Sequence, residues 1–268
     1  MYFGINAGFG DSLIPEIAGL QSLRYTEVRQ DLQYITSPDL LRARMQELRG
    51  TKLRPLWIMR PEQLVYAAPG DRVELLNEPN LGNARDTTYW PVSPDTYASM
   101  WNTYAALALA RGVIIFVGSI SNLDRRSLTW FRTAWAGMRM KPTHVSVHRY
   151  AETTGGITKP HKGFCNRDEE VFALRDIIGN ATIAVTEFGY HTGTRKRWGF
   201  WPLRPYTPEQ VRTLLTEEWD FWLEHGAESA YLYQLNDGPA NDPMDRYGIR
   251  DIHGHWKPAA TAHWDVLE

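Results

Sequence analysis

The sequence has almost no cysteine, no long hydrophobic run and no excess of either charge. Its 268 residues include one cysteine, Cys165, which excludes an internal disulfide framework. No apolar stretch approaches the roughly 20 residues that a membrane-spanning helix needs, so no membrane partner is expected. The 29 lysines and arginines nearly balance the 31 aspartates and glutamates, and this net charge of -2 argues against a general nucleic-acid binder.

The first residues also lack the pattern of a secretory leader. Residues 2–6 already have the composition of a strand, and no basic segment, apolar run and cleavage site come before them. No signal peptide is therefore visible, and the localisation stays open. Export by another route, release by lysis, action inside the cell and a leader removed beforehand all agree with this sequence.

Aromatic residues are abundant instead, with 11 tryptophans and 13 tyrosines. Such side chains fill cores, and they also form flat, half-polar binding surfaces. A chain of this length fits one α/β barrel or two small domains. Because we find no internal repeat, low-complexity tract or linker, we expect a single domain over residues 1–268.

Eight strand-like runs alternate with helix-like stretches along the chain. Ser37-Pro38, Ser93-Pro94 and Thr207-Pro208 each pair a capping residue with a proline at the first helical position, which predicts three helix starts. The expected helices cover residues 11–20, 37–50, 93–112, 128–138, 169–178, 207–226 and 258–267. The expected strands cover residues 2–6, 23–31, 52–59, 73–77, 113–117, 144–148, 181–187 and 229–235. Eight such units predict a closed parallel (β/α)8 barrel of the α/β class.

Two of these strands end in a glutamate. Glu78 follows the apolar run of residues 73–77 and precedes Pro79, which cannot continue a strand. Glu187 ends the seventh strand and precedes a glycine turn at Gly189. The carboxyl ends of all barrel strands share one rim, so both glutamates are predicted to face one cavity. Two carboxylates are what a glycosidase needs: about 5 Å apart for retention of configuration, and about 6.5–9.5 Å apart for inversion.

The motifs resemble those of glycoside hydrolase clan A, the retaining (β/α)8-barrel glycosidases, over nearly the whole chain. Asn77–Pro79 is similar to the acid/base motif after the fourth strand of that clan, and Thr186–Gly189 is similar to its nucleophile motif. Arg29, late in the second strand, resembles the arginine beside the nucleophile. His148 and Tyr150, late in the sixth strand, resemble the active-site histidine and tyrosine of the clan.

The resemblance implies a role for each of these residues. Glu187 is the nucleophile and stays ionised because Arg29 lowers its pKa, while Tyr150 donates a hydrogen bond to the same carboxylate. Glu78 first donates a proton to the leaving oxygen and then acts as a base toward water. Asn77 contacts a sugar hydroxyl. His148 orients Glu78 or a sugar hydroxyl.

Structural roles remain open for the supporting residues. Arg29 can be the partner of a structural ion pair, and His148 and Tyr150 can be core residues with satisfied hydrogen bonds. Many clan members end the eighth strand with a tryptophan in the sugar site, but this chain has Tyr231–Asp237 there, where Gln234 is the candidate substrate contact. Trp57 is a further candidate for stacking on a sugar, or a core residue.

The segment between the seventh strand and the next helix, residues 191–206, is long enough to form a wall of the cleft. Its Trp198 and Trp201 are candidates for stacking on a sugar, with covering of the barrel edge as the alternative. The cations of Arg195–Arg197 are expected to be solvated, and an acidic glycan is the other partner considered for them.

We therefore expect a monomeric retaining O-glycoside hydrolase of polysaccharide degradation, whose partner is a carbohydrate substrate. It is expected to cleave a β-linked polysaccharide or oligosaccharide by double displacement, with endo action. The alternatives are an exo-acting β-glycosidase and a catalytically silent barrel that binds carbohydrate. No cofactor is expected, and no metal, because no cluster of acidic and histidine residues has convincing ligand spacing.

Overall fold

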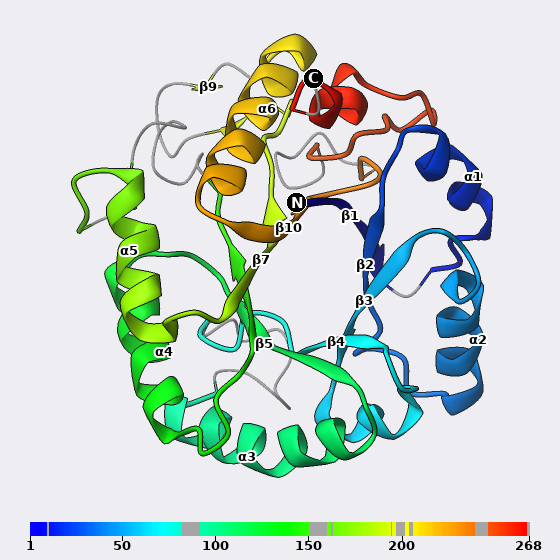
Figure 1. The fold of residues 1–268 in the computed structure, drawn as a ribbon. Helices are drawn as coiled ribbons and strands as arrows, with labels where there is room; N and C mark the ends of the chain where they lie inside the picture. The colour runs from blue at the N-terminus through cyan, green and yellow to red at the C-terminus, as the bar shows by residue number, and fades with distance from the viewer. Residues whose placement is uncertain are drawn as a thin grey trace.

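Eight parallel strands close into a barrel in a computed structural model of the chain, and helices surround them (Figure 1). The structure describes residues 1–9, 11–81, 92–150, 160–161, 163–193, 195–196, 202–203, 206–238 and 246–266. Each barrel strand pairs with the next one along the chain, and the last, β10, closes on β1. The predicted (β/α)8 barrel of the α/β class is confirmed.

The eight barrel strands coincide with the eight predicted runs, with shifts at their ends. They are β1 (Tyr2–Phe9), β2 (Glu27–Asp31), β3 (Arg54–Met59), β4 (Arg72–Leu75), β5 (Ile114–Ile120), β6 (His144–His148), β7 (Thr182–Phe188) and β10 (Ala227–Leu232). β8 (Arg195–Lys196) and β9 (Pro202–Leu203) form a separate antiparallel pair. The eighth barrel strand therefore carries the label β10.

The helices begin where capping residues stand. The hydroxyl groups of Ser37, Ser93 and Thr207 each accept a hydrogen bond from the backbone three residues on, as predicted. Asp124 caps a helix that begins at Arg125, earlier than residue 128, so that expectation was wrong. The helices are α1 (Ile14–Ser22), α2 (Pro38–Leu48), α3 (Pro94–Ala110), α4 (Arg125–Gly137), α5 (Arg167–Ile178) and α6 (Pro208–Glu224).

Two short segments, η1 (Pro61–Tyr66) and η4 (Pro258–Trp264), are 3-10 helices. The last predicted helix, residues 258–267, is thus a shorter and tighter helix than a regular amphipathic α-helix. None of the helices among the described residues combines the length and the apolar character needed to cross a bilayer.

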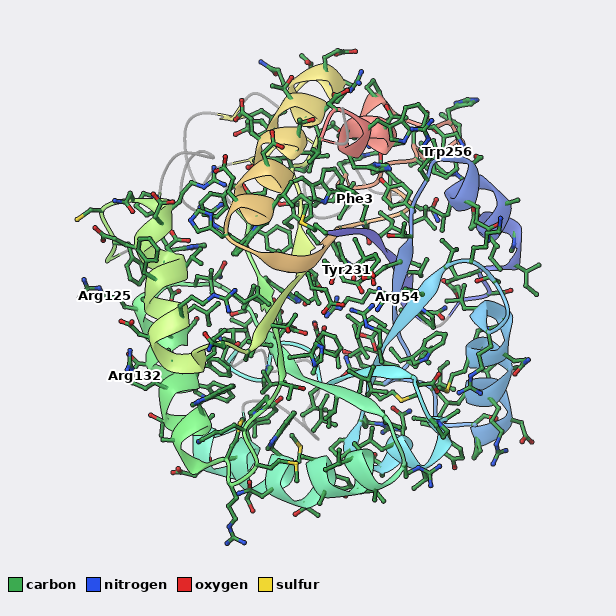
Figure 2. All side chains as sticks on the ribbon, in the orientation of Figure 1. Phe3, Arg54, Arg125, Arg132, Tyr231 and Trp256 are labelled. Carbon is green, nitrogen blue, oxygen red and sulfur yellow. The ribbon has the colours of Figure 1, made fainter. Side chains whose placement is uncertain are left out.

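Apolar side chains fill the interior of the barrel. Leu56, Phe116, Ala184 and Tyr231 form a fully buried cluster inside the strands, separate from the larger core under the helices. Figure 2 shows Tyr231 near the middle of the ring of helices. A Cβ on Gly4 would lie 2.2 Å from the Tyr231 ring, so this ring requires glycine opposite it. The packed interior leaves the carboxyl ends of the strands as the place for a site.

Candidate active site

The catalytic candidates after β4 stand on an unusual backbone. β4 ends at Leu75, and the next residues include Leu76 with φ +67° and Glu78 with φ +48°. Left-handed conformations at residues other than glycine cost about 1–3 kcal/mol each and concentrate at functional sites. The strand therefore ends before Asn77, which corrects the predicted end. A hydrogen bond from the Glu78 N–H to Ser119 Oγ (3.3 Å), at β5, helps to hold this turn.

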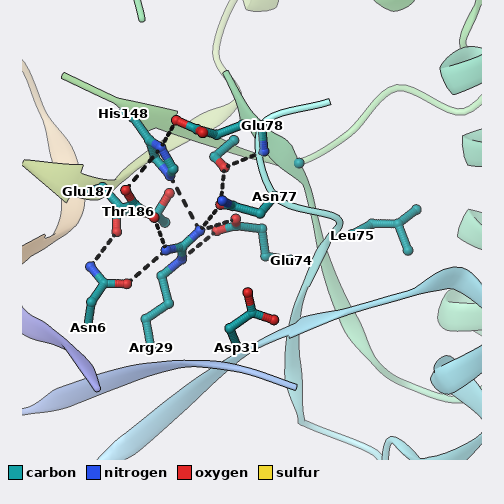
Figure 3. Close-up of polar contacts among 12 residues, drawn as sticks. Asn6, Arg29, Asp31, Glu74, Leu75, Asn77, Glu78, His148, Thr186 and Glu187 are labelled. Atoms are coloured by element: carbon teal, nitrogen blue, oxygen red, sulfur yellow. Dashed lines mark hydrogen bonds and ion pairs between the residues drawn. The ribbon is translucent and has the colours of Figure 1, made fainter. Parts of the chain in front are cut away.

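The structure brings Glu78, His148 and Glu187 together at one mouth of the barrel (Figure 3). His148 Nδ1 lies 2.9 Å from Glu78 Oε1 and 3.4 Å from Glu187 Oε2. One facing atom from each of the three residues lies within 4.8 Å of the others. A carboxylate pair this close matches the spacing of about 5 Å typical of retaining glycosidases, and it is narrower than the spacing of inverting enzymes.

Both oxygens of the Glu187 carboxylate are held by donors. Arg29 Nη1 donates to Oε1 at 2.7 Å, and the Tyr150 hydroxyl donates to Oε2 at 2.6 Å. Burial alone would raise the pKa of Glu187, but the electrostatic effects of His148 and Arg29 and the hydrogen bond from Tyr150 outweigh it. The pKa of Glu187 therefore lies below its usual range, and this carboxylate is ionised at neutral pH.

Arg29 also holds Glu74 and Asn77 in place beneath the two catalytic candidates. Its Nε and Nη2 contact the two carboxylate oxygens of Glu74 at 3.1 and 2.5 Å, and Nη2 donates to Asn77 Oδ1 at 2.7 Å. Ser119 Oγ donates to the same Asn77 oxygen at 3.0 Å. Because both described bonds end on Oδ1, the side-chain nitrogen of Asn77 is oriented to donate to a ligand hydroxyl.

Three members of this network were missed by the sequence analysis. Glu74 stands between Val73 and Leu75 in β4, and Asn6 is a polar residue in β1 that accepts from Arg29 Nη1 at 2.8 Å. Asn6 Nδ2 also donates to the carbonyl of Thr186 at 2.8 Å. Ser119 is the third. A charged side chain between two apolar residues of a barrel strand was the available signal for Glu74.

Among the described residues, three tyrosines form an aromatic cluster beside Glu187. The ring centroid of Tyr150 lies 6.1 Å from that of Tyr233 and 5.7 Å from that of Tyr247, both edge-on. A Cβ on Gly189 would lie 2.5 Å from the Tyr233 carbonyl oxygen and 3.0 Å from the Tyr247 ring, so the turn after β7 has room only for glycine. Tyr233 follows β10, near the position where many clan members carry a tryptophan.

Two further predicted contacts among the described residues, Trp57 and Gln234, do not join this network. Trp57 is fully buried in the core under the helices, because Leu56 takes the inward-facing position on β3 and alternation turns Trp57 outward. This corrects its prediction as a sugar contact. Gln234 is half-buried after β10, and its backbone bonds to Tyr247 and Ile249. Trp198 and Trp201 lie outside the described residues, as does Arg197 between the two short strands.

Glu78, His148 and Glu187 are also residue types that bind divalent metals, and they are the metal-like cluster among the described residues. The donor set does not fit a metal, however. Arg29 and Tyr150 already occupy the two Glu187 oxygens, and the guanidinium would repel a cation placed beside them. These contacts therefore disfavour a cation in this cluster.

A further buried carboxylate, Asp31, ends β2 close to the Arg29–Glu74 pair (Figure 3). It accepts hydrogen bonds from the backbone N–H (3.0 Å) and the side-chain Nε2 (2.9 Å) of Gln33. Burial nevertheless raises the pKa of Asp31 to about 6. The folded protein thus binds a proton on Asp31 more tightly than the unfolded chain does.

This raised pKa predicts a pH-dependent gain from Asp31→Asn. The contribution of Asp31 is fully present below the unfolded pKa of 3.8 and is lost as pH rises through about 6. The free energy of unfolding of the variant, relative to wild type, should rise by roughly 3 kcal/mol between pH 3.5 and 7. Urea unfolding across this range measures it. The exposed Asp39→Asn serves as the control, and an equally flat difference for both variants would contradict the prediction.

Comparison with known proteins identifies solved structures that share this fold. No protein-family model matches the chain, and no curated protein matches it significantly. A GH128 subgroup V exo-β-1,3-glucanase from Cryptococcus neoformans shares 16% identity with a TM-score of 0.63, over 96% of either chain. A GH128 subgroup II endo-β-1,3-glucanase from Sorangium cellulosum shares 13% identity with a TM-score of 0.66, over 98% of this chain and 97% of its own.

A third similar structure is named for binding. It is a GH128 subgroup VII oligosaccharide-binding protein from Trichoderma gamsii, with 15% identity and a TM-score of 0.61, over 98% of this chain and 93% of its own. At sequence identities this low, structural similarity establishes the fold only. The activity must be inferred from the residues of the site. The resemblance to the (β/α)8 barrels of glycoside hydrolase clan A is confirmed in respect of the fold.

Proposed function

We propose that the protein is a retaining glycoside hydrolase that cleaves β-linked glycans, with Glu187 as nucleophile and Glu78 as acid/base. One observation carries the proposal: two carboxylates, from β7 and from the turn after β4, have facing oxygens within 4.8 Å. This spacing leaves room for a covalent intermediate and is narrow for a water molecule between carboxylate and sugar. The lowered pKa of Glu187 supports its role, because a nucleophile must be ionised.

The proposed reaction has two steps. In the first, a Glu187 oxygen attacks the anomeric carbon while Glu78 protonates the leaving oxygen, which gives a glycosyl ester on Glu187 and a released sugar. In the second, Glu78 takes a proton from water, the resulting oxygen attacks the anomeric carbon, and Glu187 leaves as a carboxylate. Arg29 and Tyr150 then bind the restored charge.

Asn77 and His148 support these steps. The side-chain nitrogen of Asn77 would donate to a sugar hydroxyl next to the anomeric carbon, while its oxygen stays on Arg29 and Ser119. His148 lies between the two carboxylates and would exchange hydrogen bonds with Glu78 as that residue changes protonation state.

A β-1,3-glucan is the first substrate to test. Similar structures include an endo-β-1,3-glucanase and an exo-β-1,3-glucanase on the same fold. We propose endo action on a polymer, with exo action as the alternative. Release of mixed oligosaccharides with a rapid fall in viscosity indicates endo cleavage, whereas release of one small sugar indicates exo cleavage.

The second candidate function is carbohydrate binding without catalysis. The oligosaccharide-binding protein with this fold favours it. The close pair Glu78 and Glu187, together with the donors on Glu187, favours catalysis, because this arrangement supplies both carboxyl groups that a double displacement requires.

The anomeric form of the first product tests the proposal. In NMR spectra recorded during hydrolysis of a β-1,3-glucan oligosaccharide, the β-anomer should appear first and the α-anomer only later by mutarotation. An initial α-anomer would indicate inversion and contradict the mechanism. Saturable binding without any product, across a panel of β-glucans, mannans, xylans and uronate polymers, would support the silent barrel instead.

A further inference from the structure

The guanidinium of Arg29 is shared between two carboxylates on opposite edges. Its Nε–Nη2 edge contacts both oxygens of Glu74, at 3.1 and 2.5 Å, and its Nη1 contacts Glu187 at 2.7 Å. Glu74 has no exposed surface and Arg29 has 2%. A bidentate pair of this kind fixes the plane of the guanidinium as well as its charge. Figure 3 shows Glu74 beside Arg29, and the Nη2 atom that contacts Glu74 also lies 3.3 Å from His148 Nε2.

We propose that Glu74 is a positioning residue for the reaction: it fixes the plane of Arg29 and shares its positive charge, so that Glu187 receives a single nitrogen and part of one charge. The inference rests on the proposed function and deepens it. Glu74 does not contact the reacting atoms, so it acts only through Arg29.

The charge balance explains why such sharing matters. A buried carboxylate needs a cation to stay ionised, but a cation bound to it alone would lower its basicity and slow its attack on carbon. The titratable groups that face Glu187 come from several elements. Arg29 of β2, His148 at the end of β6 and Tyr150 just after it contact Glu187, and Glu78 lies on the other side of His148. Glu74 and Asp31 lie against Arg29, and Tyr233 lies beside Tyr150.

The barrel offers a matched control at its other end. Glu27, the first residue of β2, is as buried as Glu74 and lies 2.6 Å from Nη1 of the buried Arg72. Figure 2 labels two of its other contacts, Tyr231 and Arg54, near the middle of the ring of helices. Glu74→Gln removes the carboxylate of a buried ion pair next to the candidate active site. Glu27→Gln removes the carboxylate of a buried ion pair away from that site.

The test compares pH profiles and labelling rates. In Glu74→Gln, Arg29 is left with Glu187 as its paired carboxylate, so the acid limb of kcat/KM should move to lower pH by about one unit. The rate at which an activated fluoroglycoside labels Glu187 at pH 7 should fall about threefold, because a more weakly basic carboxylate attacks more slowly. Glu27→Gln should leave both the limb and the labelling rate unchanged.

A conservative variant separates charge from orientation. Glu74→Asp keeps the charge but shortens the side chain, so the acid limb should stay in place while the labelling rate falls at least threefold, as the bidentate contact is lost. Thermal unfolding checks that each variant is folded. If Glu74→Gln does not fold, the labelling rate of Glu74→Asp becomes the test of the proposal. A rate equal to that of the wild type would overturn it.

The outcomes for this proposal and for the proposed function are distinct. A folded Glu74→Gln whose acid limb is unchanged or moves to higher pH overturns the role of Glu74 while wild-type labelling of Glu187 still supports the glycosidase. Absence of any label on wild-type Glu187 overturns the glycosidase itself, together with this inference. Equal effects of Glu74→Gln and Glu27→Gln indicate a purely structural role and also overturn it.

Discussion

Glu187→Gln should lose hydrolytic activity almost completely, with kcat/KM falling on the order of 10⁵-fold or more, as expected when a catalytic nucleophile is removed. The amide nitrogen and oxygen of glutamine are poor nucleophiles, so no glycosyl ester can form. The fold should survive, because Arg29 keeps its bidentate contact with Glu74 and the glutamine oxygen can still accept from Arg29 or Tyr150.

Mass spectrometry with an activated fluoroglycoside locates the chemistry. Wild-type protein should gain the mass of one fluorosugar, on a peptide containing β7, and Glu187→Gln should gain none. Glu209→Gln, an exposed change in the first turn of α6, is the control for the substitution itself and should label fully. Labelling of another carboxylate, or normal turnover by Glu187→Gln, would remove Glu187 from the role proposed here.

The barrel and its pair of glutamates could be predicted because both depend on rules that act over short stretches. Apolar runs bounded by capping and turn residues gave eight strands, and the closure of parallel strands places all their carboxyl ends on one rim. Glu78 and Glu187 follow from that geometry, although 109 residues separate them along the chain. Their roles stay proposals that only chemistry can test.

The features that we did not predict from the sequence are set by strand register and by backbone strain. Whether Leu56 or Trp57 faces the barrel interior is decided by a shift of one residue, which the apolar run of β3 does not reveal. Glu74 has its partner, Arg29, on β2, so its role in the site can be recognised only once the strands are placed together. The left-handed backbone at Leu76 has no local signal, because leucine avoids this conformation.

The tyrosines beside Glu187 show a different limit of motif reasoning. The clan resemblance led us to look for a tryptophan at the end of the eighth strand, and its absence left that contact open. In the structure Tyr233 stands after β10, and Tyr247 comes from a segment that pairs with the backbone of Gln234. The second ring comes from a stretch without regular secondary structure, so no strand-based count could have placed it beside the first.

Glu78→Ala should lose activity in a way that depends on the leaving group. For a natural glycan, whose leaving alcohol needs a proton, kcat/KM should fall by about 10²–10⁴-fold. For an aryl glycoside with a good leaving group the first step needs no acid, so kcat/KM should stay near wild type. The glycosyl-enzyme then accumulates, because no base activates water for the second step.

Azide distinguishes this mechanism from simple damage to the site. The alanine leaves space where the Glu78 carboxylate lay, within 4.8 Å of Glu187, and azide attacks without any base. Added azide should therefore raise kcat of Glu78→Ala on the aryl glycoside at least tenfold and give a β-glycosyl azide, while Glu187→Gln should not respond. Equal losses on both substrates, or rescue of neither variant, would show that Glu78 is not the acid/base. A β-glycosyl azide combines inversion at each of two steps, so its configuration alone requires a covalent intermediate on the opposite face of the sugar.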